Sequence, residues 1–80
     1  MGADNYNLIK DHFKSIWDDF LVIQFMDLNF NERAAILRMY REEINPSQAD
    51  NSWCGACVTE MFKNLINLYE SICTSNGGNR

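Results

Sequence analysis

Apolar side chains recur every three or four positions in the first part of the chain. This spacing is the period of one helix face, so it predicts an amphipathic helix over about residues 5–26, with Asp4 as its N-terminal cap. The stripe comprises Ile9, Phe13, Ile16, Trp17, Phe20 and Leu21. Residues 20–26 are apolar on every side except at Gln24, which fits a buried helix end or a short extended piece. A helix is the favoured interpretation.

A second helix is predicted over about residues 30–44. Asn29 and Glu32 have the spacing of a capping box, in which each side chain satisfies the other residue's free backbone N–H. The helix is expected to end before Pro46, because proline disfavours the helical conformation in the residue that precedes it. Its apolar stripe comprises Ile36, Leu37, Tyr40 and Ile44.

A polar loop then leads to a third predicted helix, over about residues 52–74. Asp50, Asn51 or Ser52 is expected to cap it. The pattern therefore predicts an all-α protein, either a three-helix bundle or a helical hairpin plus a third helix. We expect one domain over residues 1–74 and a flexible tail over residues 75–80. The third helix has a wide apolar face of Val58, Met61, Phe62, Leu65, Ile66, Leu68, Tyr69 and Ile72.

Charge excludes two classes of partner. The 80-residue chain has a net charge of −4, and its seven Lys and Arg residues are scattered. Nucleic acids and anionic membranes both require a basic surface, so we expect neither as a ligand. No apolar run approaches the length that spans a bilayer, and the N-terminus lacks the pattern of a secretory signal. These features predict the cytoplasm of a cell as the location, or a virion.

The sharpest local motif is Trp53-Cys54-Gly55-Ala56-Cys57. It resembles the WCGxC active site of the thioredoxin superfamily, and the positive end of a helix dipole would favour a reactive thiolate there. The thioredoxin fold also needs a strand before the motif and a cis-proline after it. A polar loop precedes the motif here, and the single proline, Pro46, lies upstream. The resemblance therefore does not extend to the fold.

Three interpretations of Cys54 and Cys57 remain open. The two side chains can pack as small apolar residues. They can act in thiol–disulfide exchange, with Cys54 as the nucleophile and Cys57 as the resolving thiol. They can also supply half of a zinc site that is shared between two chains. Cys73 lies about 24 Å further along the same predicted helix, too far to join either residue within one chain.

No other residues form a recognisable catalytic set. His12, the single histidine, lies beside the apolar stripe of the first helix and is expected to be a boundary residue. The adjacent carboxylates at 18–19 and 42–43 point about 100° apart on a helix, so neither pair forms a dyad. The sequence therefore predicts no enzyme, unless the cysteine pair is a thiol oxidoreductase.

The wealth of aromatic and methionine side chains points to a partner. A chain of this size cannot bury all of them equally well, and exposed apolar patches mark partner sites. The predicted anchors are members of the wide third-helix face together with Trp17 or Trp53, docking on a larger protein or on a second copy. The third-helix anchors are Phe62, Ile66 and Tyr69.

Residues 36–69 resemble small uncharacterised proteins of phages that infect gut Bacteroidetes, including crAss-like phages. The shared pattern is an amphipathic helix, Asn45-Pro46, a short polar loop, the Cys54–Cys57 motif and a helix that contains Met61-Phe62. The resemblance implies a small accessory protein that binds a virion or tail component, and it implies no catalytic residues.

Overall fold

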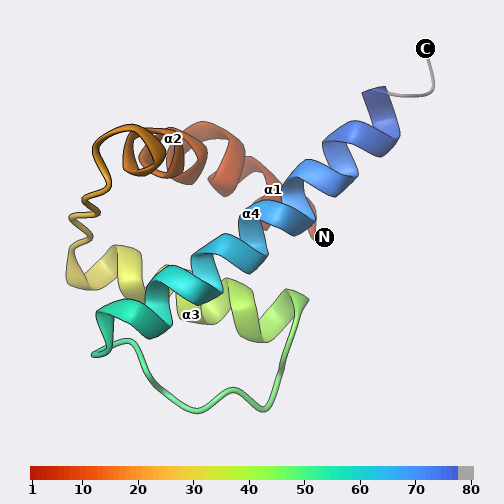
Figure 1. The fold of residues 1–80 in the computed structure, drawn as a ribbon. Coiled ribbons are helices and arrows are strands. Elements are labelled where there is room, and N and C mark those ends of the chain that lie inside the picture. Colours follow the sequence, from red (N-terminus) through yellow and green to blue (C-terminus); the bar gives the residue numbers. More distant parts are fainter. Residues whose placement is uncertain (78–80) are drawn as a thin grey trace.

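The computed structural model describes the backbone of residues 1–77 and the side chains of residues 1–74. All regular structure within this range is helical, so the predicted all-α fold is confirmed (Figure 1). Three helical segments follow one another: a first segment made of α1 (Ala3–Leu8), η1 (Ile9–Phe13) and α2 (Lys14–Ile23), then α3 (Phe30–Glu43), then α4 (Gly55–Gly77).

The first segment begins earlier than the sequence predicted. Gly2, not Asp4, is the residue before the first helical turn, and Asp4 lies inside that turn. An acidic side chain is favourable there because it faces the positive end of the helix dipole. The η1 turn has the wider π winding, and it carries the buried side chains of Ile9 and Phe13.

The end of α2 differs most from expectation. Gln24 adopts the left-handed conformation, with φ of 58°, and its backbone N–H donates to the carbonyl of Phe20. The helix therefore stops at Ile23, three residues before the predicted end. The prediction of a buried helix end is also wrong, because Val22 is 82% exposed and Phe25 is 66% exposed.

The capping box at the start of α3 is confirmed. The Asn29 side chain accepts a hydrogen bond from the Glu32 backbone N–H at 2.8 Å, and the Glu32 carboxylate accepts one from the Asn29 N–H at 2.9 Å. The second bond is the main reason that the pKa of Glu32 lies below its ordinary value, and His12 adds to the effect. His12 Nε2 lies 2.7 Å from the Glu32 carboxylate and thereby links the first segment to α3.

The longest helix, α4, begins at Gly55, three residues later than predicted. The first helical hydrogen bond runs from the Val58 N–H to the Cys54 carbonyl, which puts Cys54 at the capping position. The prediction that Asp50, Asn51 or Ser52 caps this helix is therefore wrong. The helix continues to Gly77, beyond the predicted end, and the rest of the predicted tail lies outside the described residues.

Aromatic side chains from the first segment and from α4 form the centre of the core. Phe62 is 1% exposed, and its ring centroid lies 5.6 Å from that of Phe13 and 5.1 Å from that of Trp17. Offset and edge-on contacts of this kind add to the free energy gained by burying the rings. From α3, Ile36, Leu37 and Met39 complete the same core. The first segment and α3 thus together cover the wide apolar face of α4.

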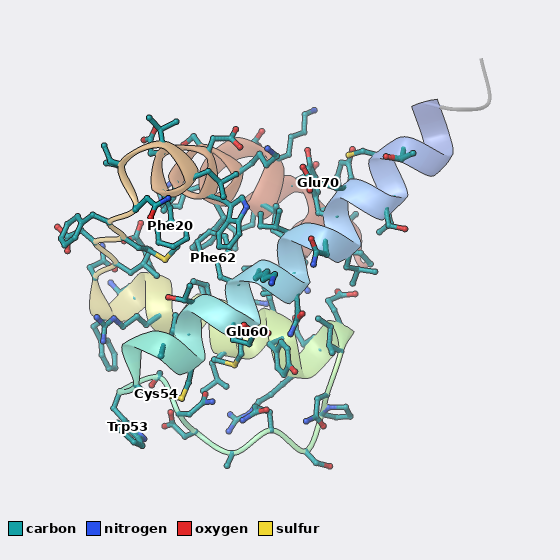
Figure 2. The ribbon with its side chains drawn as sticks, in the orientation of Figure 1. Phe20, Trp53, Cys54, Glu60, Phe62 and Glu70 are labelled. Atoms are coloured by element: carbon teal, nitrogen blue, oxygen red, sulfur yellow. A yellow bond between two sulfur atoms is a disulfide. The ribbon has the colours of Figure 1, made fainter. Side chains whose placement is uncertain are left out.

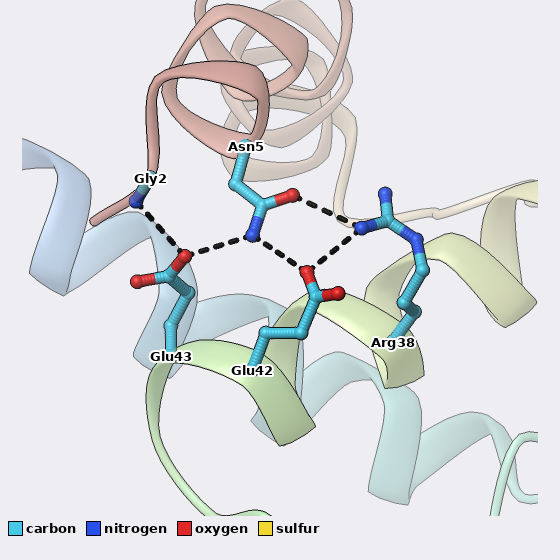
Figure 3. A network of polar contacts seen from close by, with 5 residues as sticks. All are labelled: Gly2, Asn5, Arg38, Glu42 and Glu43. Atoms are coloured by element: carbon cyan, nitrogen blue, oxygen red, sulfur yellow. Dashed lines mark hydrogen bonds and ion pairs between the residues drawn. The ribbon is translucent and has the colours of Figure 1, made fainter.

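A polar network joins the beginning of the first segment to the end of α3 (Figure 3). The Asn5 side-chain amide donates to Glu42 at 2.9 Å and to Glu43 at 2.8 Å, and its oxygen accepts from Arg38. The Glu43 carboxylate also accepts the Gly2 backbone N–H. Burial acts to raise the pKa of Glu43, but these hydrogen bonds outweigh it and hold the pKa below the ordinary value. Asn5 is therefore buried with its polar atoms paired.

Candidate docking surface and disulfide

Among the large apolar side chains that are exposed near the ends of α2, α3 and α4, four line hollows at one end of the molecule. Phe30 and Trp53 are each 79% exposed, and Ile23 and Phe25 are each 66% exposed. We call these four residues the apolar end surface. An apolar cluster left in water on a small protein is typical of a site that binds a partner.

The path of the chain explains why these residues meet. In Figure 1, α2 ends, and α3 and α4 begin, on the left side of the view. Both α3 and α4 can start there because the loop 44–54 runs back along the length of α3. Arg41 holds this loop by donating from Nε to the Gln48 carbonyl at 2.7 Å. The surface is thus built from three helix ends rather than from one helix face.

Hollows connect the exposed side chains. One hollow, of about 300 Å³, lies between Phe30 and Trp53, and Leu28 and Arg33 form part of its wall. A second, of about 250 Å³, shares Leu28 and Arg33 and reaches Phe25. A third, of about 210 Å³, joins Phe25 to Ile23. The apolar end surface is therefore continuous, with concave places that can receive apolar side chains of a partner.

Charge is unevenly distributed around this surface. Asp19 and Asp27 line the hollow that contains Ile23 and Phe25, and both are exposed. Neither carboxylate forms an ion pair with any residue in the range 1–74. The single cation that lines the three hollows is Arg33. The side near α2 is therefore acidic and favours basic groups on a partner.

A tight turn presents Trp53. The Asp50 carboxylate accepts hydrogen bonds from the Ser52 backbone N–H at 3.1 Å and from the Ser52 hydroxyl at 2.8 Å. These bonds hold the pKa of Asp50 below its ordinary value. The Cys54 N–H donates to the Asn51 carbonyl at 3.0 Å and completes the turn. Figure 2 shows Trp53 pointing away from the globule beside Cys54.

A disulfide joins Cys54 and Cys57, whose Cα atoms are 5.2 Å apart. Both residues are half-buried. The Cys54 sulfur accepts a hydrogen bond from the Cys57 backbone N–H at 3.2 Å, so it caps the first turn of α4. The structure thus brings the two sulfur atoms together in a bond, and the role of the pair stays a matter for prediction.

The described residues hold no group of three or more His, Cys, Asp or Glu side chains that could bind a metal ion. Zinc binds the thiolate form of cysteine, so the Cys54–Cys57 disulfide would have to be reduced before it could contribute. A zinc ion shared between two chains stays a prediction.

Trp53 is exposed, whereas the other predicted anchors are buried. Trp17, Phe62, Ile66 and Tyr69 are each no more than 9% exposed, so the prediction that they are exposed is wrong. The helical period identified the apolar face of α4 but not which of its side chains the neighbouring helices cover. The residues that sequence reasoning missed are Ile23, Phe25 and Phe30. The apolar run at 20–26 was the signal for Ile23 and Phe25, although a buried helix end was the favoured interpretation of it; Phe30 lies outside that run.

Cys73 lies far along α4 from the disulfide, against the first segment. Its sulfur is 3.6 Å from the Tyr6 hydroxyl, and the rings of Tyr6 and Tyr69 have centroids 5.1 Å apart. Burial, followed by the neighbouring Cys73 and Tyr6, raises the pKa of Tyr69 to about 12. These contacts pack the start of the chain onto α4.

Comparisons with protein-family models, curated proteins and solved structures found no match to this chain. None of the helices in residues 1–77 is both long and apolar enough to cross a lipid bilayer.

Proposed function

We propose that this protein is a helical interaction module that binds another protein through the apolar end surface. The observation that carries the proposal is the exposure of Phe25, Phe30 and Trp53 around connected hollows at one end of a well-packed core. The partner is a polypeptide segment with apolar side chains, which fill the hollows, and at least one Lys or Arg, which meets Asp19 and Asp27.

The acidic residues beside the apolar end surface favour a different protein as its partner, rather than a second copy of the chain or a membrane. Two copies joined through this surface would bring Asp19 and Asp27 of both chains together, while Arg33 alone lines the hollows as a cation. Like charges placed opposite each other in an interface disfavour association. The same two carboxylates, and the net charge of −4, repel an anionic lipid surface. The resemblance of residues 36–69 to small phage proteins supports a virion or tail component as the partner.

This proposal can be tested with an array of 15-residue peptides in which apolar content and charge are varied separately. The purified chain is expected to bind peptides that combine aromatic or aliphatic side chains with Lys or Arg. A Phe25→Ser, Phe30→Ser, Trp53→Ser variant is expected to lose at least about tenfold in affinity, since each side chain would bury apolar area in the complex. Because all three side chains are mainly exposed, this variant should keep its fold.

Ile44→Ser is the matched control, because Ile44 is a 40% exposed apolar residue at the opposite end of α3. It should bind like the unmodified chain. Equal binding of acidic and basic apolar peptides would contradict the partner chemistry. A dimer in sedimentation analysis that the triple variant abolishes would instead identify a second copy as the occupant and overturn the proposal.

A further inference from the structure

The disulfide lies beside the apolar end surface. Trp53 directly precedes Cys54, and the hollow between Phe30 and Trp53 adjoins the start of α4. Gly55, which lies between the two cysteines, lines the hollow that reaches Phe25. A Cβ atom added to Gly55 would meet no atom within 4 Å. Space for a side chain is therefore open at the residue that follows Cys54.

A second groove reaches the disulfide from the other side of α4. It has a volume of about 380 Å³ and contains Cys57. The amide side chains of Gln48 and Asn64 form part of its wall, together with the carboxylate of Glu60, and amides offer both donors and acceptors to a peptide backbone. An extended chain crossing the disulfide would thus meet an apolar hollow on one side and an amide-lined groove on the other.

The start of α4 stabilises negative charge on Cys54. The Cys57 N–H points at the Cys54 sulfur at 3.2 Å, and the positive end of the helix dipole acts on the same atom. The first turn of α4 contains no acidic residue that would oppose this effect. A Cys54 thiolate would therefore be a good leaving group and a stable product of reduction.

From these observations we propose that the Cys54–Cys57 disulfide exchanges with cysteine thiols of a polypeptide held on the apolar end surface. This inference relies on the proposed function for the placement of the substrate. The substrate class is a polypeptide dithiol with apolar and basic residues next to its cysteines.

The reaction balances as one dithiol–disulfide exchange. A substrate thiolate attacks the Cys54 sulfur, the Cys54–Cys57 bond breaks, and Cys57 leaves as a thiolate that takes a proton from solvent. The second substrate thiolate then attacks the substrate sulfur of the mixed disulfide, and Cys54 leaves as a thiolate held by the Cys57 N–H. The substrate loses two electrons and becomes a disulfide, while Cys54 and Cys57 become two thiols.

The test uses the full chain with its disulfide intact, without oxygen, at pH 7. One probe is a synthetic dithiol peptide with Leu, Phe and Lys around its cysteines, and the other has Gly, Ser and Glu in their place. The apolar, basic peptide should be oxidised about tenfold faster, because docking raises its effective concentration at Cys54. With a Cys57→Ser variant, the oxidised form of that peptide should be trapped as a mixed disulfide at Cys54, as mass spectrometry of a digest would reveal.

Dithiothreitol, which needs no docking surface, separates the two proposals. The Phe30→Ser, Trp53→Ser variant should lose the preference for the apolar peptide, while Ile44→Ser, outside the apolar end surface, should keep that preference and react with dithiothreitol like the unmodified chain. Dithiothreitol can be compared on two disulfides: that of the folded chain and that of a linear peptide of residues 51–58. If it reduces both at the same rate, the fold does not activate the disulfide. The exchange inference then fails, while the docking proposal stands. Equal rates for the two dithiol peptides, together with fast reduction by dithiothreitol, would also overturn exchange with a docked polypeptide.

Discussion

The rings of Phe13 and Phe62 meet nearly at right angles, with centroids 5.6 Å apart and planes at 88°. This contact joins the π-wound turn of the first segment to the middle of α4. Phe62→Ala should lower the free energy of unfolding by about 3–5 kcal/mol, because it removes buried area and leaves a cavity. Urea denaturation followed by circular dichroism measures the loss.

Trp53→Ala is the matched control for that experiment. Trp53 is an aromatic residue close in sequence, but it is 79% exposed, so its removal should change the free energy of unfolding by no more than about 0.5 kcal/mol. A Trp53 variant destabilised as much as the Phe62 variant would contradict the assignment of one residue to the core and the other to the surface.

The capping box gives a second stability prediction. Asn29→Ala removes the acceptor for the Glu32 N–H and should cost about 1 kcal/mol, as measured by thermal unfolding. Asn31→Ala, an exposed position in the first turn of the same helix, should cost less because Asn31 makes no capping bond. Equal losses in the two variants would mean that the Asn29 cap contributes no stability.

Acid should weaken the protein partly through Glu32. Because the pKa of this carboxyl is lowered in the folded state, the ionised form adds stability above the ordinary value of 4.5. That stability is lost as pH falls through the lower, folded-state value. Glu32→Gln keeps an acceptor for the Asn29 N–H but cannot ionise. Its unfolding free energy should therefore change less between pH 6 and pH 3 than that of the unmodified chain, and an equally steep decline would contradict this assignment.

Reduction of the Cys54–Cys57 disulfide should leave the protein folded. The bond closes a loop of only a few residues, so it restricts the unfolded chain weakly and should contribute at most about 2 kcal/mol. Unfolding in urea with and without a phosphine reductant measures this difference. A reduced chain that loses its helical circular dichroism signal would show that the disulfide is needed for folding, and would leave no folded dithiol product for the proposed exchange.

The sequence predicted the helices well because apolar periodicity and a capping box are local signals. Ile36 and Leu37 mark one face of α3, and Asn29 with Glu32 marks its start. Asn5 could not be predicted, because its buried network depends on two glutamates that only the folded chain brings near it. The same limit explains why Phe62 was expected at the surface: a period gives the direction of a side chain, and packing alone decides what covers it.

The apolar end surface was missed for a related reason. An apolar run such as residues 20–26 is usually buried, and nothing local shows that α2 stops at Ile23. The left-handed Gln24 ends the helix and leaves Ile23 and Phe25 in water. Phe30 and Trp53 join them because three helix ends meet, which is a property of the tertiary fold.

Nuclear magnetic resonance of the ¹⁵N-labelled chain, titrated with the tightest peptide from the array, tests the docking proposal most directly. Binding at the apolar end surface predicts that amide shifts concentrate in residues 20–33 and 52–59, together with the Trp53 indole signal. Residues around Tyr69, at the other end of α4, should stay unchanged. Shifts that concentrate around Tyr69 and the first helical turn, with the Trp53 signal unmoved, would contradict the account.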